Sequence, residues 1–243
     1  MKNFSNTYIF GFSTVMVLVV AALLSFVAEE LRPMQERNVE LEKMTDILRS
    51  VEKTEGMEDA EDRDQFIENQ FSEYINKSFV VNNQGNILDG RDAFEITKDL
   101  KAELDKPVEE RGLPVFVFEG TDGKNKYIIP VYGKGLWGPI WGYVAVNNDF
   151  NTISGAIFDH SKETPGLGAE INTDWFAEMF EGKTLFDEDG NFVSIKVVKG
   201  GVSGTAPHSV DAISGGTITS KGVEEMLYDC LKPYLSYFKQ QKN

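Results

Sequence analysis

An uncharged apolar segment near the N-terminus constrains the architecture of this chain more than any other feature. No charged residue lies between Lys2 and Glu29, and residues 8–28 are predominantly apolar. About 20 consecutive apolar residues are what a helix needs to cross the hydrocarbon core of a bilayer. The alternative is a cleaved signal peptide, whose apolar core is normally only about 7–15 residues long. We therefore expect an uncleaved transmembrane helix over residues 8–28, after a short tail of residues 1–7.

The segment that follows has an amphipathic pattern. Met44, Ile47, Leu48 and Val51 lie on one stripe of a predicted helix, and a glycine at position 56 offers a stop. Residues 29–57 are therefore predicted to form a juxtamembrane helix that lifts the rest of the chain away from the membrane.

The charges that flank the apolar segment do not determine its orientation. Lys2 and the amino terminus precede the segment, whereas Arg32, Arg37 and Lys43 follow it. Because Lys and Arg favour the cytoplasmic side, this count does not favour an external location for the C-terminal part of the chain.

From residue 58 onward, apolar runs alternate with turn signals. Short β-branched and aromatic runs predict strands at residues 79–81, 87–88, 115–118, 127–132, 139–146 and 153–159, and a last hairpin between 185–186 and 192–198. Apolar residues at spacings of three and four predict helices near 67–75, 171–180 and 223–234. Residues 94–106 are ambiguous and are compatible with a helix.

Composition excludes several classes of function. A net charge of −15 argues against binding nucleic acid, whose phosphates would be repelled. The single cysteine, Cys230, excludes an internal disulfide and any iron–sulfur cluster held only by cysteines of this chain. Its place on the apolar face of the C-terminal helical pattern predicts a buried thiol. His160 and His208 show no metal-ligand spacing, so no metal site is predicted.

A cluster of hydroxyl and glycine residues precedes the C-terminal helical pattern. Residues 211–220 hold four Ser or Thr side chains, with Gly215 and Gly216 adjacent to each other. Backbone N–H groups at a helix N-terminus have no intrahelical partner and attract anions. In one interpretation, Ser214 or Thr217 simply caps the helix. In the other, the cluster binds a phosphate, and the glycines let the backbone approach the ligand closely.

Residues 214–220, Ser-Gly-Gly-Thr-Ile-Thr-Ser, closely resemble the covalent-flavin motif of a family of FMN-binding domains. The family includes NqrC of the Na+-translocating NADH:quinone oxidoreductase and the related FMN-binding protein of the Rnf electron-transport complex. The resemblance implies that Thr219 carries one FMN through a phosphoester bond, which a separate flavin transferase makes from FAD. Gly216 departs from the pattern, because the family usually has alanine there. The missing methyl group should loosen the turn slightly and leaves the acceptor hydroxyl in place.

A second segment matches the same family. Residues 163–168, Glu-Thr-Pro-Gly-Leu-Gly, correspond to its second hallmark. The proline and two glycines predict a rigid loop whose backbone can approach a planar ring. In the resemblance, Glu163 and Thr164 would contact the polar edge of the isoalloxazine ring and Leu167 would pack on its face, next to Gly168.

Residues 133–138 formally match the dinucleotide-binding pattern G-x-G-x-x-G. A dinucleotide site requires a helix directly after the glycines, whereas residues 139–146 have the composition of a strand. We therefore do not expect a Rossmann site. In the resemblance, this segment corresponds to a Gly-Leu-Trp stretch near the flavin. Two roles for Trp137 therefore stay open, a contact with the flavin and packing in the core. Lys199, at the end of the last predicted hairpin, is a further candidate to face the flavin or its phosphate.

The strand pattern and the resemblance together predict an α+β fold. One twisted, mostly antiparallel sheet would be flanked by helices and preceded by a single transmembrane helix. Residues 58–126 would form the N-terminal part of the soluble region, and residues 127–243 would form the core of the FMN-binding domain. The presence of residues 58–126 favours an NqrC-type chain over the shorter Rnf protein.

The resemblance also implies a function. FMN on Thr219 would relay single electrons from an intramembrane iron centre to the covalent FMN of a neighbouring subunit. The chain shows no NADH, quinone or Na+ site and no catalytic residue of its own, so its partners would be the other subunits of the complex and the lipid bilayer. The family location is the bacterial inner membrane, with the soluble domain on the periplasmic side.

A function of a different class stays open at this point. The chain could be a membrane-tethered extracellular interaction module without a cofactor. The amphipathic juxtamembrane segment and the acidic surface support that alternative, whereas the ordered flavin motifs argue against it.

Overall fold

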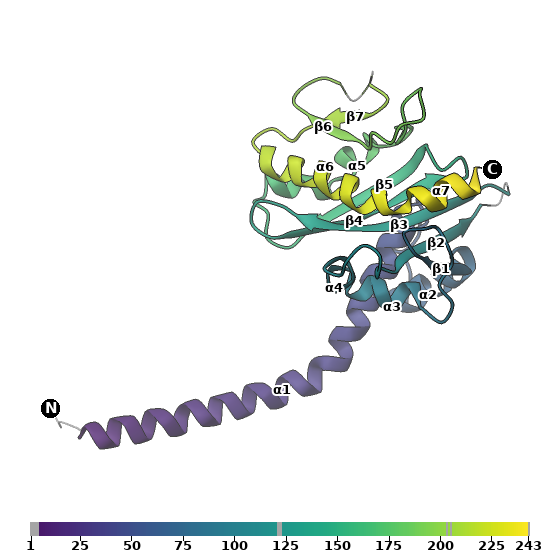
Figure 1. Cartoon of the computed structure of the whole chain (residues 1–243). Helices are drawn as coiled ribbons and strands as arrows, with labels where there is room; N and C mark the ends of the chain where they lie inside the picture. The colour runs from purple at the N-terminus through teal and green to yellow at the C-terminus, as the bar shows by residue number, and fades with distance from the viewer. Residues whose placement is uncertain (1–4, 121–122, 203, 205, 243) are drawn as a thin grey trace. The chain divides into compact units, whose positions relative to one another are not determined.

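The computed structural model describes residues 5–120, 123–202, 204 and 206–242, which fall into two units divided after Glu42. Within the first unit, residues 6–42 are part of helix α1 (Asn6–Arg49), whose last turns belong to the second unit (Figure 1). This helix, with a mean hydropathy of 2.4 in its most apolar window, is long and apolar enough to cross a membrane. The expected N-terminal apolar helix is therefore present. One continuous helix covers the expected transmembrane segment 8–28 and most of the expected juxtamembrane segment 29–57, because α1 continues through Pro33.

Helix α1 ends at Arg49, earlier than the predicted end at residue 57, because of a local capping motif. Glu52 has a φ of 59°. Its N–H donates to the carbonyl of Arg49 (3.0 Å), and the N–H of Lys53 donates to the carbonyl of Leu48 (2.9 Å). This pair of bonds closes a helix C-terminus when one residue is left-handed. Glu52, rather than Gly56, therefore stops the helix.

Five strands of the second unit form one antiparallel sheet in the order β1-β2-β3-β4-β5. Each strand pairs with its neighbour in the sequence, as a meander requires. The predicted, mostly antiparallel sheet is confirmed. Because β2 pairs with β3, this sheet extends across residue 127, the expected boundary between the two parts of the soluble region. The strands are β1 (Lys77–Val81), β2 (Leu113–Glu119), β3 (Asn125–Lys134), β4 (Pro139–Asn147) and β5 (Ile153–His160).

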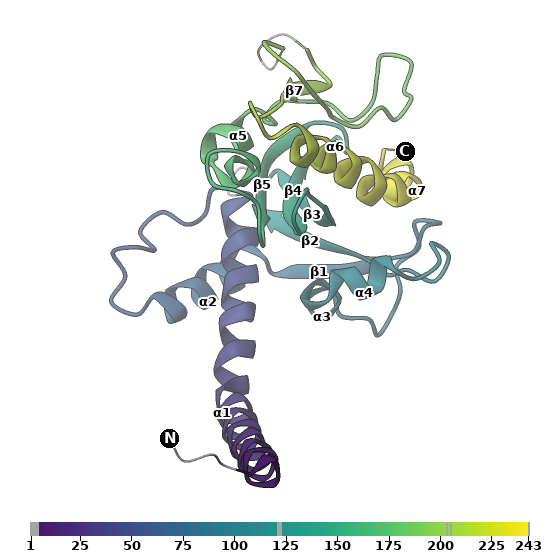
Figure 2. The ribbon, with the colours of Figure 1, turned by 90° about the vertical axis from the view of Figure 1, so that its left-hand side faces the viewer.

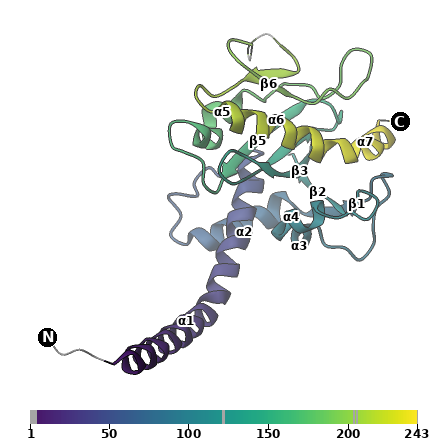
Figure 3. The same ribbon diagram turned by 60° about the vertical axis from the view of Figure 1, so that its left-hand side comes forward.

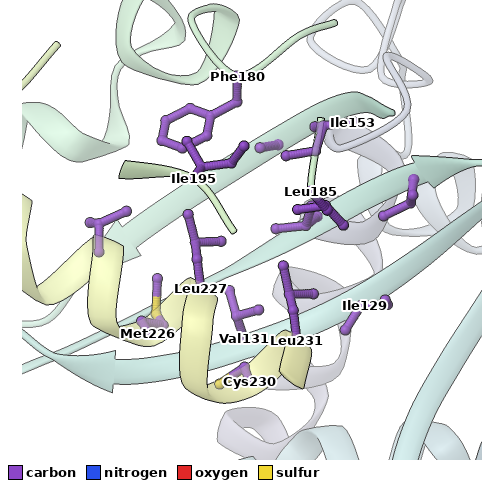
Figure 4. Close-up of a cluster of buried hydrophobic side chains, with 14 of the residues drawn as sticks. Ile129, Val131, Ile153, Phe180, Leu185, Ile195, Met226, Leu227, Cys230 and Leu231 are labelled. Carbon is purple, nitrogen blue, oxygen red and sulfur yellow. The ribbon is translucent and has the colours of Figure 1, made fainter. Parts of the chain in front are cut away.

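Helix α6 (Thr217–Leu231) covers one face of this sheet, and η2 (Lys232–Tyr234) and α7 (Leu235–Gln241) continue from its end (Figures 1 and 2). Leu227 and Leu231 of α6 lie over Ile129 and Val131 of β3 (Figure 4). All four side chains are fully buried. Burial of this apolar surface is the main force that holds the helix on the sheet.

The opposite face is covered by α2 (Arg63–Tyr74) and α3 (Ala93–Lys98), with α4 (Leu100–Leu104) following α3 (Figure 3). Phe71 of α2, Phe94 of α3 and Phe116 of β2 meet edge to face, with ring centroids 5.9–6.5 Å apart. The predicted helix near residues 67–75 is thus confirmed, and the ambiguous segment 94–106 forms two short helices.

The region after β5 differs from the prediction in its pairing. β6 (Lys196–Val198) pairs in parallel with β7 (Ser209–Asp211) to form a separate two-stranded sheet. The predicted last hairpin is reduced to a single antiparallel bridge between Phe186 and Phe192. A parallel partner that is distant in sequence leaves no local signal, which explains the error.

The helix predicted over residues 171–180 is also shorter than expected. A 3₁₀ turn, η1 (Gly168–Asn172), precedes α5 (Asp174–Glu178). Thr173 separates the two, because its extended backbone places its Oγ1 to accept the N–H of Phe176 (3.4 Å) as a new N-cap.

Candidate functional site

Three segments that are distant in the sequence meet around one cavity. They are the turn between β3 and β4, the loop that follows β5, and the N-terminal end of α6. The cavity has a volume of about 380 Å³. It brings all three sequence motifs together, and its lining residues are Leu136, Trp137, Glu163, Thr164, Leu167, Gly168, Gly215, Gly216, Thr217, Ile218 and Thr219.

The meander places the first two segments at the same end of the sheet. Strand β4 begins where β5 ends, because the two strands are antiparallel and Ile140 lies opposite His160. The N–H of Ser161 donates to the carbonyl of Pro139 (3.1 Å), which holds the two loops together. Strand β4 directly follows the glycine-rich segment 133–138, so the strand predicted after these glycines is confirmed, whereas a dinucleotide site requires a helix there.

Close packing of α6 on β3 brings in the third segment. A Cβ at Gly222 would collide with the carbonyl oxygen of Lys134, and a Cβ at Gly133 would lie 2.7 Å from the Cβ of Met226. Glycine at these positions therefore allows the helix and the strand to approach without intervening side chains. This approach carries the first turn of α6, including Thr219, to the loops.

Thr219 forms the floor of the cavity together with Glu163. Both side chains are buried, with relative exposures of 1% and 5%. The hydroxyl of Thr219 donates to Oε2 of Glu163 at 2.6 Å. The other carboxylate oxygen, Oε1, accepts the backbone N–H of Trp137 at 2.8 Å. A chain of hydrogen bonds thus links the three motifs through one carboxylate.

Two glycines make room for this carboxylate. A Cβ at Gly168 would lie 2.5 Å from Oε2 of Glu163 and 2.5 Å from Oγ1 of Thr219. A Cβ at Gly135 would lie 2.5 Å from Oε1 of Glu163. Such distances are shorter than van der Waals contact, so any larger side chain would displace the pair. The glycines of the two loops therefore serve the site directly.

The N-terminus of α6 faces the cavity without a capping side chain. Its N-cap residue is Gly216, and within the described part of the chain no side chain accepts a hydrogen bond at this cap. The interpretation in which Ser214 or Thr217 caps the helix is therefore wrong. Ser220 instead accepts the N–H of Ile213 through its Oγ (3.0 Å), which fastens the preceding turn. The N–H groups of the first helical turn are thus oriented to bind an anion.

Exposed apolar side chains surround the mouth of the cavity. Trp137 is 63% exposed, which excludes the core position considered for it from the sequence. Leu136, Leu167 and Ile218 are also exposed. Large apolar groups clustered on a surface are typical of a ligand or partner site. The rim is therefore suited to a flat apolar ligand above the polar floor.

Two of the candidate residues lie outside the cavity lining. Ser214 is exposed on the turn before α6, and Lys199 is exposed after β6. A role for Lys199 toward a flavin or its phosphate stays a prediction. Gly215, with a φ of 76°, does line the cavity, where a Cβ would lie 2.5 Å from Cδ2 of Leu167.

Cys230 and His208 both make contacts within the fold. Cys230 is buried, as predicted, and burial raises the pKa of its thiol to about 11. His208 bonds the carbonyl of Thr184 through Nδ1 (2.6 Å). Among the residues that the structure describes, no group of three or more His, Cys, Asp or Glu side chains could hold a metal ion.

Sequence reasoning missed three contributors to the site. Leu136 and Ile218 line the cavity, and both lie within motifs noted in the sequence, the Gly-Leu-Trp stretch and residues 214–220, but neither was predicted to contact a cofactor. His160 accepts the backbone N–H of Glu163 through Nδ1 at 3.3 Å and so helps to fix the loop. Its position three residues before Glu163 was the available signal.

The chain is similar to known proteins in the same region and beyond. Residues 135–232 match the family model of the FMN-binding domain. NqrC of the Na(+)-translocating NADH-quinone reductase of Vibrio anguillarum is 36% identical over 220 residues, which cover 85% of this chain and 83% of that protein. The corresponding protein of Pseudomonas aeruginosa is 42% identical over 123 residues, or 49% of this chain and 46% of that protein.

Two solved structures also resemble this fold. The crystal structure of NqrC of the Na(+)-translocating NADH-quinone reductase from Parabacteroides distasonis superposes with a TM-score of 0.72 at 43% identity, covering 86% of this chain and 96% of that one. Shewanella oneidensis NqrC superposes with a TM-score of 0.68 at 28% identity, covering 86% and 99%. The resemblance seen in the sequence is thus confirmed. On this identity and coverage, the chain belongs to the NqrC family of Na(+)-translocating NADH-quinone reductases.

Proposed function

We propose that this chain is the membrane-anchored flavoprotein subunit of a Na+-pumping NADH:quinone reductase, with one FMN attached to Thr219 through a phosphoester. The observation that carries this proposal is the position of the Thr219 hydroxyl, buried at the floor of a cavity that joins all three flavin motifs. A Rnf-type protein is less well supported, because the named relatives are NqrC proteins over most of their length.

The residues of the cavity fit FMN. Its volume of about 380 Å³ lies in the range of roughly 300–1,000 Å³ that is usual for ligand sites. The uncapped N-terminus of α6 suits a phosphate next to Thr219. The exposed side chains of Trp137, Leu167 and Ile218 suit the apolar faces of an isoalloxazine ring.

The polar edge of the ring requires a donor or acceptor from the protein. Both oxygens of Glu163 already have partners within the chain. Thr164, which is exposed and lines the cavity, is therefore the better candidate of the two residues considered for that contact.

When bound, FMN supplies the one-electron chemistry, and the chain supplies position and surroundings. Attachment through Thr219 would keep the cofactor from being lost by dissociation. The cavity opens to the surface beside Trp137, where a redox partner could approach. We infer that the partners are the other subunits of the complex, including those with the iron centre and the second covalent FMN, together with a flavin transferase during maturation.

We also infer that residues 8–28 cross the bacterial inner membrane and that the second unit lies on the periplasmic side. The apolar helix supports the membrane location, and the family resemblance supports the side. Labelling a Glu188→Cys variant with a membrane-impermeant thiol reagent in intact cells would test the side, because Cys230 is buried and Glu188 is exposed. A cysteine that reacts only after cell lysis would contradict it.

The attachment proposal is tested with the full chain produced in cells that contain the flavin transferase. We expect flavin fluorescence to stay with the denatured protein band, and peptide mass analysis to show FMN on Thr219. The Thr219→Ala variant should carry no covalent FMN, whereas the Ser214→Ala variant should keep its FMN, because Ser214 lies outside the cavity. An unmodified wild-type chain would leave the cofactor-free interaction module as the better description.

A further inference from the structure

The acceptor of the Thr219 hydroxyl lies outside the helix that carries Thr219. A buried helical threonine commonly donates to the backbone carbonyl four residues earlier. Thr97 of α3 does so, with Oγ1 2.8 Å from the carbonyl of Ala93. Thr219 instead donates to a carboxylate that lies 56 residues away in the sequence. The fold therefore directs Glu163 specifically to the oxygen of Thr219.

Glu163 also differs from two other buried glutamates of this chain. The carboxylate of Glu103 bonds Arg91 and Lys106, and that of Glu224 bonds Lys221. Burial opposes ionisation of both, but their hydrogen bonds, with those cations among the donors, keep the pKa of each carboxyl below its usual value.

The hydrogen-bond donors that the described residues offer to Glu163 are neutral. Within the described residues, no Lys or Arg forms an ion pair with it, and its partners are the Thr219 hydroxyl and the Trp137 N–H. Burying a carboxylate without a cation opposes folding. Such an arrangement is typical of a group that accepts a proton during a reaction.

Taking the proposed attachment of FMN as its basis, we propose that Glu163 is the proton acceptor that activates Thr219 for that attachment. Oγ1 of Thr219 attacks the phosphorus of a flavin dinucleotide and forms a new P–O bond. The phosphoanhydride P–O bond breaks, and its electron pair leaves with a nucleoside monophosphate. The hydroxyl proton passes to Oε2 of Glu163, which is already 2.6 Å from Oγ1. The chain thus brings its own base to the transferase.

The geometry keeps this base in place. Oε1 is held by the N–H of Trp137, and the backbone N–H of Glu163 is held by Nδ1 of His160. Gly135 and Gly168 close around the carboxylate so tightly that neither position has room for a Cβ. Little reorganisation is then needed before the proton moves.

The transfer also removes an electrostatic conflict. An ionised Glu163 would face the negative phosphodiester at the distance now occupied by the hydroxyl, and like charges so close repel strongly. A carboxyl that has taken the Thr219 proton is neutral and can donate a hydrogen bond to the phosphoester.

The test uses full-length chain purified without FMN, a purified flavin transferase and flavin adenine dinucleotide. The initial rate of FMN attachment is followed by the mass of the intact chain. Glu163→Gln keeps the size of the side chain but is a much weaker base, so we expect the maximal rate to fall by about 10²-fold or more. The concentration of chain that gives half-maximal rate should change little, because the surface presented to the transferase is unchanged.

Glu170→Gln is the matched control, because Glu170 lies in the turn η1 that follows the loop, is outside the cavity lining, and accepts the N–H of Gly166 (2.9 Å). We expect this variant to react at the wild-type rate. Wild-type rates for Glu163→Gln would overturn the proposal. Failure of the wild type to react would instead overturn the attachment of FMN itself.

The Glu163→Asp variant distinguishes a role of Glu163 as a base from a purely structural role. It keeps the carboxylate but withdraws it by one methylene group, so its rate should lie between those of Glu163→Gln and the wild type. Thermal unfolding of each unmodified variant shows that the chains compared are folded. Equal rates for the Asp and Gln variants would overturn the role as a base, because charge would then be irrelevant.

Discussion

The two ends of helix α6 each bury a side chain of a nucleophilic type, yet their surroundings differ. Near the N-terminal end, Thr219 donates to a carboxylate and borders a cavity. Near the C-terminal end, the thiol of Cys230 donates to the backbone carbonyl of Tyr132 (3.3 Å). Burial raises the pKa of this thiol to about 11. The surroundings, rather than the type of side chain, decide which of the two can react.

Other contacts at the two ends of α6 also differ. The first turn of α6 has no capping side chain, and Ile218 is exposed. Beyond the last turn, the hydroxyl of Tyr234 donates to the carbonyl of Pro114 (2.8 Å), and Phe238 is fully buried. The first end presents uncapped backbone N–H groups to the cavity beside Thr219, whereas beyond the second end the side chains of Tyr234 and Phe238 are packed into the core. Changes at the first end should therefore affect attachment, and changes at the second should affect stability.

The largest expected effect is that of Gly168→Ala. The added methyl group would lie 2.5 Å from both Oε2 of Glu163 and Oγ1 of Thr219, so the pair should separate and covalent FMN should be lost. Overpacking of this kind also costs about 1–3 kcal/mol of stability. Gly138→Ala is the control, because its Cβ would meet Lys162 at an ordinary 3.4 Å. In-gel flavin fluorescence measures both, and an equal signal from the two variants would contradict the role given to Gly168.

Beyond the C-terminal end of α6, Tyr234→Phe should lower the free energy of unfolding and leave attachment unchanged. The variant leaves the buried carbonyl of Pro114 without its donor, which costs about 1–3 kcal/mol. Tyr228→Phe is a suitable comparison, since its hydroxyl makes no hydrogen bond to the described residues. Denaturant unfolding gives the difference. Loss of flavin from the Tyr234 variant would show that the two ends are coupled.

The smallest expected effect is a pH dependence that arises from Cys230. The folded chain holds the thiol proton up to about pH 11, whereas the unfolded chain releases it near its ordinary value of 9.0. The contribution of this thiol is thus fully present below the unfolded pKa and is lost as pH rises above it. Between about pH 8 and 9.5, we expect the wild type to lose about 1 kcal/mol more than Cys230→Ala. Parallel stability curves for the two proteins would disprove a protonated buried thiol.

Local sequence predicted the elements that are specified locally. The strands β2 to β5 were predictable because β-branched and aromatic runs are separated by turn residues. The pairing of β6 with β7 was not, because each is three residues long and its partner is distant in sequence. The N–H of Val197 in β6 is bonded by the carboxylate of Glu224 from α6, a contact that no local pattern indicates.

The site shows the same limit. The motif residues of the cavity were identified by resemblance, and the open N-terminus of α6 agrees with a phosphate site rather than a capped helix. The bond between Glu163 and Thr219 could not be predicted, because it depends on how closely Gly168 and Gly135 allow the loops to approach. The contact of Glu163 with the flavin ring, which the resemblance implies, stays a prediction, whereas the bond of its carboxylate to Thr219 is seen only in the structure.

The separation of Glu163 and Thr219 by 56 residues has a consequence for biosynthesis. A nascent chain whose sheet is complete, but whose last helix is still on the ribosome, contains the loop and not the acceptor. A misfolded chain contains both motifs but does not hold the hydroxyl against the carboxylate. Under our proposals, the flavin label would therefore mark only those molecules that have finished folding, and the flavin-to-protein ratio of a preparation would report the fraction correctly matured.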